Sequence, residues 1–133
     1  MISKYYLRRD DLVDPDLSFK IVGVLFEVYN QLGGGYREKY YQKAISLELR
    51  NVGLLFKEQV TIPLIYKSQS IGNNYLDFLI ENKIVLEIKS GEYFNRRYIE
   101  QIYSYLKETK IKLGILAVFT KTALRYKRIL NVR

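Results

Sequence analysis

The stretch Asn74-Tyr-Leu-Asp-Phe-Leu-Ile-Glu-Asn-Lys-Ile-Val-Leu-Glu-Ile-Lys89 decides the fold, because two short apolar runs lie on either side of a polar break. Apolar runs of this length predict strands, and Glu81-Asn82-Lys83 is typical of a three-residue hairpin loop. We therefore expect an antiparallel hairpin in which Asp77 lies opposite Glu87. The predicted pairs are Ile80 with Ile84, Leu79 with Val85, Phe78 with Leu86 and Asp77 with Glu87.

Three charged residues, Asp77, Glu87 and Lys89, lie inside these apolar runs. A buried charge carries a desolvation cost unless it is paired or binds an ion. Side chains alternate along a strand, so the two carboxylates would share one face with Cβ atoms roughly 5 Å apart, and Lys89 would project from that face. Two carboxylates and a lysine on one face are what metal-assisted phosphodiester hydrolysis requires. A structural ion pair between Glu87 and Lys89 is the alternative.

The composition limits the chemistry that such a site can use. The chain has 133 residues, 48% of them hydrophobic, which indicates one globular domain. It has no histidine and no cysteine, so the commonest general base, the commonest zinc ligand, thiolate chemistry and disulfides are excluded. Any metal must be held by oxygen ligands, which favours Mg²⁺ or Mn²⁺.

Charge and hydropathy indicate the partner and the compartment. The net charge is +8, which suggests a polyanionic partner without separating DNA from RNA or an anionic membrane. The thirteen tyrosines could stack on nucleic acid, or be core and strand residues. We expect no membrane segment, since no run of about 18 uncharged apolar residues is present, and we expect a cytoplasmic protein.

The first half of the chain predicts an N-terminal arm over residues 1–15 and a single domain over 16–133. A helix is expected to begin near Asp16 or Ser18, to bury a stripe that starts at Phe19, and to end at the triple glycine Gly33–Gly35. The predicted stripe consists of Phe19, Val22, Phe26 and Tyr29. A second helix is expected over 37–51.

The rest of the chain predicts three strands, a helix, a fourth strand and a final helix. Pro63 suggests that the first strand, 54–66, lies at an edge or contains a bulge, and Glu58 on it could point inward or be solvated. A helix over 95–110 leads to an apolar strand over 113–120, and the basic residues 121–133 are expected to form an amphipathic helix. The order is ααβββαβα, an α/β fold with a central mixed four-stranded sheet flanked by helices.

This order, with Asp-x9-Glu-x-Lys across the second and third strands, resembles the PD-(D/E)XK nuclease superfamily. The segment Gly35-Tyr-Arg-Glu38-Lys-Tyr-Tyr41 resembles the motif that names the GxxExxY family, a small prokaryotic group within that superfamily. The supporting motifs are Phe56–Val60 ahead of Ile-Pro, Tyr75–Ile80, Val85–Ser90, Gln101 ahead of Tyr-Ser-Tyr-Leu-Lys, and Leu113–Leu116. The resemblance covers roughly residues 17–133 and implies a restriction-endonuclease-like core.

The resemblance implies a metal centre. Asp77 and Glu87 would hold one or two divalent ions, with the backbone carbonyl of Ile88 as a further oxygen ligand. Lys89 would stabilise the negative charge that develops on the phosphate.

Two further residues would complete the catalytic set. Glu38 would reach the metal directly or through water, although it could instead complement the dipole of its helix. Gln101 would orient the substrate or a water molecule. Related nucleases often have a histidine a few residues before that glutamine, and here Arg96 and Arg97 stand in that region.

The sequence therefore predicts a Mg²⁺-dependent nuclease that acts on DNA in preference to RNA. The alternatives are a non-catalytic nucleic-acid-binding module and a regulatory subunit that retains the nuclease fold. A homodimer stays open.

Overall fold

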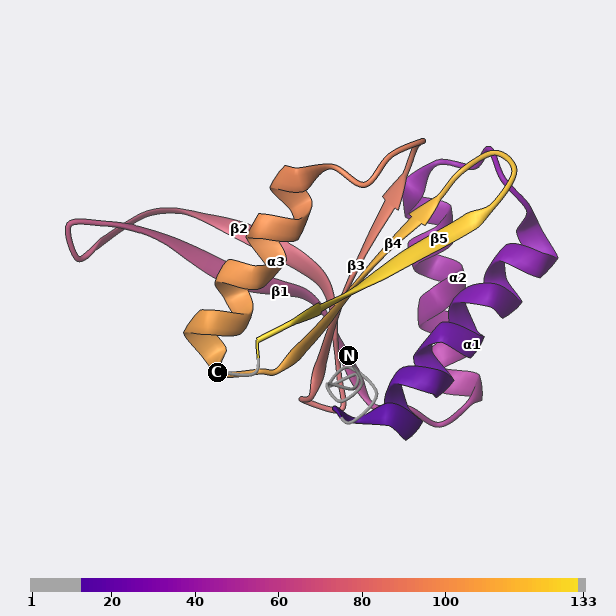
Figure 1. Cartoon of the computed structure of the whole chain (residues 1–133), viewed down its shortest axis with the longest axis horizontal. Coiled ribbons are helices and arrows are strands. Elements are labelled where there is room, and N and C mark those ends of the chain that lie inside the picture. The colour runs from indigo at the N-terminus through magenta and orange to yellow at the C-terminus, as the bar shows by residue number, and fades with distance from the viewer. Residues whose placement is uncertain (1–12, 132–133) are drawn as a thin grey trace, which may run out of the picture.

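Figure 1 shows a computed structural model of the chain, in which residues 13–131 are described. Most of the predicted N-terminal arm therefore lies outside the described residues. No described helix has the length and apolar character needed to cross a membrane. In chain order the elements are α1 (Pro15–Leu32), α2 (Glu38–Asn51), β1 (Phe56–Tyr66), β2 (Gln69–Ile80), β3 (Ile84–Ser90), α3 (Arg96–Thr109), β4 (Leu113–Phe119) and β5 (Leu124–Leu130).

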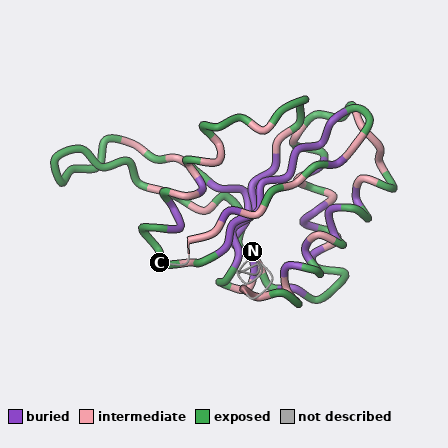
Figure 2. The backbone as a smooth tube through the Cα atoms, viewed as in Figure 1, coloured by how far each residue is buried: buried purple, intermediate pink, exposed green. Residues whose placement is uncertain are grey.

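The five strands form one mixed sheet in the order β1-β2-β3-β4-β5. β3 and β4 are parallel and are joined through α3, whereas the other neighbours are antiparallel. α1 and α2 cover one face of the sheet, here called the two-helix face, and α3 covers the other, the α3 face (Figure 1). Each face has its own apolar core, so the central strands are buried on both sides (Figure 2).

The last element corrects the sequence prediction. Residues 121–133 are expected to form a helix and the sheet is expected to have four strands, but Leu124–Leu130 is a fifth strand paired with β4. Buried Leu124 is followed by exposed Arg125, and Lys127 is exposed again two residues later, which is the alternation expected of a strand. Pairing with β5 also satisfies the backbone groups along the edge that β4 would otherwise leave open.

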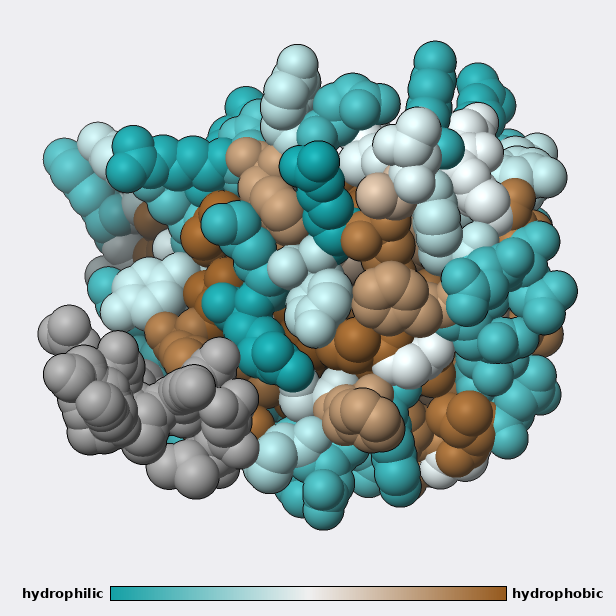
Figure 3. Space-filling view, turned by 45° about the vertical axis from the view of Figure 1, so that its right-hand side comes forward, coloured by the Kyte–Doolittle hydropathy of each residue, from teal (hydrophilic) through white to brown (hydrophobic). Residues whose placement is uncertain are grey.

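The buried stripe of α1 also differs from the prediction. Pro15 is the first residue of the helix, ahead of Asp16 and Ser18, and Phe19 is 77% exposed. The helix is apolar around most of its circumference, so its spacing fits two stripes. Apolar side chains lie among hydrophilic ones on the surface that Figure 3 shows. The buried residues of α1 are Ser18, Ile21, Val24, Leu25 and Val28.

The edge position predicted for the first strand is confirmed. β1 is the first strand of the sheet, and its pairing with β2 shifts register between Leu64 and Ile65, directly after Pro63. β2 begins at Gln69, earlier than the apolar run suggests, so β1 and β2 form a long hairpin whose far end projects from the body (Figure 1). Residues in that projecting end are mostly exposed (Figure 2).

The triple glycine does more than end α1. Gly33 is the C-cap and donates its N–H to Tyr29 O at 2.7 Å. A Cβ at Gly34 would lie 2.3 Å from the carbonyl oxygen of Lys121, in the turn between β4 and β5. The Tyr41 hydroxyl donates to Gly33 O at 2.7 Å, and its ring stacks on Phe119. The glycine loop therefore packs directly against the end of the sheet.

Replacing Gly34 by alanine is expected to destabilise the chain by about 1–3 kcal/mol, because the methyl group would meet backbone atoms that cannot rotate away. Gly23→Ala is the matched control, since Gly23 lies inside α1 and a Cβ there has no neighbour within 4 Å. That change should stabilise the chain by about 0.5–1 kcal/mol. Urea unfolding of both variants tests the pair, and equal effects would contradict the tight contact at Gly34.

Candidate active site

β2 and β3 separate at the two carboxylates. Three of the predicted pairs are present, and the ladder ends at Phe78 and Leu86. These pairs are Phe78 with Leu86, Leu79 with Val85 and Ile80 with Ile84. Beyond that point the Asp77 N–H donates to Glu87 Oε1 at 3.0 Å, and the Ile88 N–H donates to Asp77 Oδ2 at 2.7 Å. The side chains thus accept hydrogen bonds that would otherwise go to the opposite main chain. Asp77 and Glu87, here called the acidic pair, meet as predicted, although not as a ladder pair.

The hairpin changes face at this point. Leu76 packs in the core of the α3 face, whereas Phe78 packs in the core of the two-helix face. Residues two apart in a regular strand would share a face. On β1, Gln59 has a φ of 52° and lies between the residues paired with Leu76 and Phe78, so it is opposite Asp77. This turn in the hairpin directs Asp77 into the space between β2 and β3.

Both members of the acidic pair are buried, with Asp77 7% and Glu87 3% exposed. Burial and then the neighbouring Glu87 charge raise the pKa of Asp77 to about 7. Burial also raises the pKa of Glu87, although the hydrogen bond from Asp77 N–H and the charge of Lys89 oppose the shift. The pair therefore carries negative charge that its surroundings only partly compensate.

Lys89 supplies a fixed cation beside the acidic pair. Its Nζ lies 3.3 Å from Glu87 Oε2 and 4.2 Å from the centroid of the Tyr98 ring. Burial lowers the pKa of Lys89, but the charges of Glu87 and Glu38 outweigh this and raise it overall. The ammonium group therefore stays charged.

Glu38 acts on this centre through its charge, whereas Gln101 lies in a groove beside Tyr98. Glu38 is the first residue of α2, is partly buried, and its charge raises the pKa of both Asp77 and Lys89. Gln101 lies on α3 and lines a groove of about 670 Å³ between α3 and the β1–β2 hairpin, together with Tyr98. Within residues 13–131, no three acidic side chains are placed together as a metal site. The roles of Glu38 and Gln101 therefore stay predictions.

Two residues that the sequence analysis did not assign contact the centre. Gln42 on α2 donates from Nε2 to Asp77 Oδ1 at 2.6 Å. Its position four residues after Glu38 puts both on one side of the helix, which is the signal that could have identified it. Tyr98, which underlies Lys89, is three residues before Gln101 on α3 and could have been found by the same spacing.

Glu58 lies outside the centre. Its carboxylate accepts a hydrogen bond from Ser46 Oγ at 3.1 Å and lies 3.9 Å from Arg50 on α2. The side chain is 41% exposed. Glu58 therefore connects β1 to α2 and offers a carboxylate control for experiments on the acidic pair.

The donor set of the acidic pair fits a hard divalent cation. All four side-chain oxygens are carboxylate oxygens, the ligand type that Mg²⁺ prefers. Each oxygen has one partner from the chain, namely Gln42, the Ile88 N–H, the Asp77 N–H or Lys89, and a carboxylate oxygen has a second lone pair. Burial raises the pKa of both groups and so disfavours their ionised forms, and a cation bound between them would offset that cost.

Comparison with known proteins identifies the fold. Residues 15–129 match the family described as the PD-(D/E)XK nuclease superfamily. The crystal structure of SSO0001 is similar with a TM-score of 0.51 and 18% sequence identity, over 66% of this chain and 46% of that one. At this identity the likeness shows the fold alone, and the matched region spans less than half of the SSO0001 chain. No curated protein matches the chain. The predicted superfamily and its mixed sheet are confirmed, and the GxxExxY motif stays a prediction.

Replacing Asp77 by asparagine is expected to stabilise the metal-free chain at pH 8. The pKa of Asp77 is about 7 in the folded chain and 3.8 ordinarily, so the folded state binds the proton more tightly and loses stability as pH rises between these values. Asparagine keeps an acceptor for the Ile88 N–H and never ionises. The gain should be on the order of 4 kcal/mol at pH 8 and fall by more than half at pH 5.

Urea unfolding in chelator at both pH values measures this difference. Glu92→Gln is the control, because it removes an equal charge from an exposed position. A gain for Asp77→Asn that is the same at pH 5 and pH 8 would show that the carboxylate is not destabilised by burial.

Proposed function

Because the chain belongs to the PD-(D/E)XK nuclease superfamily, we propose that it is a metal-dependent nuclease that hydrolyses phosphodiester bonds of DNA in preference to RNA. The observation that supports this most directly is the buried acidic pair with a charged lysine 3.3 Å from Glu87. A structural ion pair needs only one carboxylate. The second buried carboxylate, Asp77, is costly for the fold unless a cation joins it.

The acidic pair would hold Mg²⁺ or Mn²⁺, with Ile88 O and Glu38 as further oxygen ligands. The bound ion would polarise the scissile phosphate and lower the pKa of a bound water molecule. Gln42 acts as a positioning residue, because its hydrogen bond fixes Asp77 Oδ1 while the Ile88 N–H fixes Oδ2. This two-sided restraint presents the carboxylate in one orientation.

Lys89 would stabilise the negative charge that develops on the phosphate during cleavage. Glu87 and the Tyr98 ring hold its ammonium group on two sides, so little reorganisation is needed when the charge appears. Gln101 in the adjoining groove would orient the substrate or water. The net charge of +8 favours a polyanionic substrate.

Cleavage by the purified chain is expected to require Mg²⁺ or Mn²⁺ and to fall at least about 100-fold in Asp77→Ala and Lys89→Ala, because each removes a group that acts on the developing charge. The substrates are linear, circular, branched and single-stranded DNA, and RNA, each with either metal or with chelator. Glu58→Gln serves as the matched control and should cleave like the unsubstituted chain, since Glu58 lies outside the centre.

Cleavage by Lys89→Ala at the unsubstituted rate would count decisively against this function. If no variant cleaves any substrate while calorimetry detects Mn²⁺ binding that Asp77→Ala abolishes, the chain is a non-catalytic module or needs a partner. Absence of both cleavage and metal binding would make the acidic pair structural.

A further inference from the structure

β5 carries two exposed cations on the α3 face of the sheet. Arg125 and Lys127 are exposed, and Ile129, two residues further along, packs in the core of the α3 face. Since alternate residues of a strand share a face, all three side chains leave β5 on that side. The sequence predicts a helix for this segment, and a helix would not align these cations with the acidic pair.

The register of the sheet aligns both cations with the centre. Two rows of paired residues cross β3, β4 and β5. The rows are Lys89 to Val118 to Arg125, and Glu87 to Leu116 to Lys127. Neighbouring strands lie about 4.8 Å apart, so the backbone of Arg125 is roughly 10 Å from that of Lys89. The same spacing separates Lys127 from Glu87.

Two aromatic rings lie beside cations on this face. Lys89 Nζ lies 4.2 Å from the Tyr98 ring centroid, and Arg97 Cζ lies 5.7 Å from the same ring. Lys127 Nζ lies 5.1 Å from the centroid of the Phe94 ring, which precedes α3. Both rings pack against the core of the α3 face. Arg97 therefore lies beside Lys89 at the Tyr98 ring, while Arg125 and Lys127 lie two strands away on the same face of the sheet; these three cations are here called the basic strip.

Stability does not explain the basic strip. Within residues 13–131, no carboxylate forms an ion pair with any of its three cations. Exposed charges on a surface contribute little to folding even when they are paired. Charges on an edge strand can block pairing with another chain, and that role would leave nucleic-acid binding unchanged when they are removed.

We propose that the basic strip binds the phosphodiester backbone of nucleic acid and leads it across the α3 face to the acidic pair. The inference deepens the proposed nuclease function and rests on it for the reaction, but not for the binding. Contacts with phosphates position the polymer without reading its sequence, so binding through the strip should be independent of sequence.

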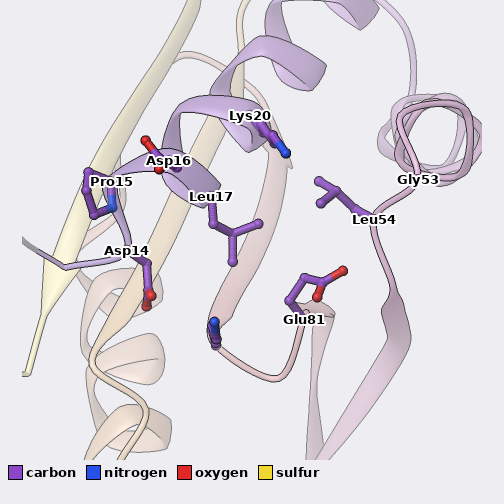
Figure 4. Close-up of a pocket in the computed structure, with 9 residues that line it drawn as sticks. Asp14, Pro15, Asp16, Leu17, Lys20, Gly53, Leu54 and Glu81 are labelled. Atoms are coloured by element: carbon purple, nitrogen blue, oxygen red, sulfur yellow. The ribbon is translucent and has the colours of Figure 1, made fainter.

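The test compares two double variants with the same change in charge. Arg125→Gln/Lys127→Gln removes two cations of the strip. Lys20→Gln/Lys83→Gln removes two cations that line a hollow of about 500 Å³ beside the β2–β3 turn (Figure 4). Lys83 is separated from Lys89 by most of β3, roughly 20 Å along the strand. Both are made in the Asp77→Asn background with chelator, so that the probe is not cleaved.

Fluorescence anisotropy of a labelled DNA duplex measures affinity between about 50 and 200 mM salt. Each phosphate contact contributes about 0.9 to the slope of log affinity against log salt. The strip variant should therefore bind more weakly than its parent and lose about 1.8 from the slope, so that its affinity falls about tenfold less than the parent's between these salt concentrations. The control should keep the slope of its parent, and circular dichroism checks that all chains are folded.

Equal losses in both double variants would overturn the proposal, because binding would then follow net charge alone. Failure of the parent to bind duplex or single-stranded DNA or RNA would overturn it too. The nuclease function is judged separately by cleavage with metal. A selective loss of slope in a chain that never cleaves would leave the strip in place and remove the catalytic role.

Discussion

The exchange of hydrogen bonds between Asp77 and the start of the Glu87-Ile88-Lys89 segment is the interaction on which the centre depends. Asp77 gives its main-chain N–H to one carboxylate and accepts a main-chain N–H with its own. Two strands of a sheet can separate in this way only if side chains take over the lost ladder bonds, since buried backbone groups need partners. The same atoms thus hold the sheet together and gather negative charge in its interior.

Side chains from the helices contact the centre from both sides of the sheet. α2 contacts Asp77 through Gln42 and adds the charge of Glu38, and its Tyr41 connects the glycine loop to Phe119 at the end of β4. α3 closes the opposite face and places Tyr98 under Lys89. The two-helix side of the sheet therefore provides an amide donor to Asp77, and the α3 side provides an aromatic ring beside Lys89.

The local part of the fold could be predicted from the sequence because it follows from alternation and spacing. The hairpin pairs from Phe78 to Ile84 and the meeting of Asp77 with Glu87 belong to this part. The change of face at Gln59 and Asp77 could not be predicted from the sequence, because a positive φ at a glutamine has no sequence signal. The helix predicted for residues 121–133 was wrong because a basic segment with apolar residues fits both the helical and the strand period. Only the open edge of β4 decides in favour of a strand. Contacts between distant elements, such as Gln42 with Asp77, depend on packing that no local pattern records.

The topology has a consequence for the order in which the chain folds. The β2–β3 hairpin joins residues only 10 or 11 positions apart, whereas each β3–β4 pair, such as Ile84 with Leu113, lies on the two sides of α3 in the chain. Local contacts form early and crossovers form late. We therefore expect the carboxylates to come together while water still surrounds them, and the docking of the parallel strand to complete their burial.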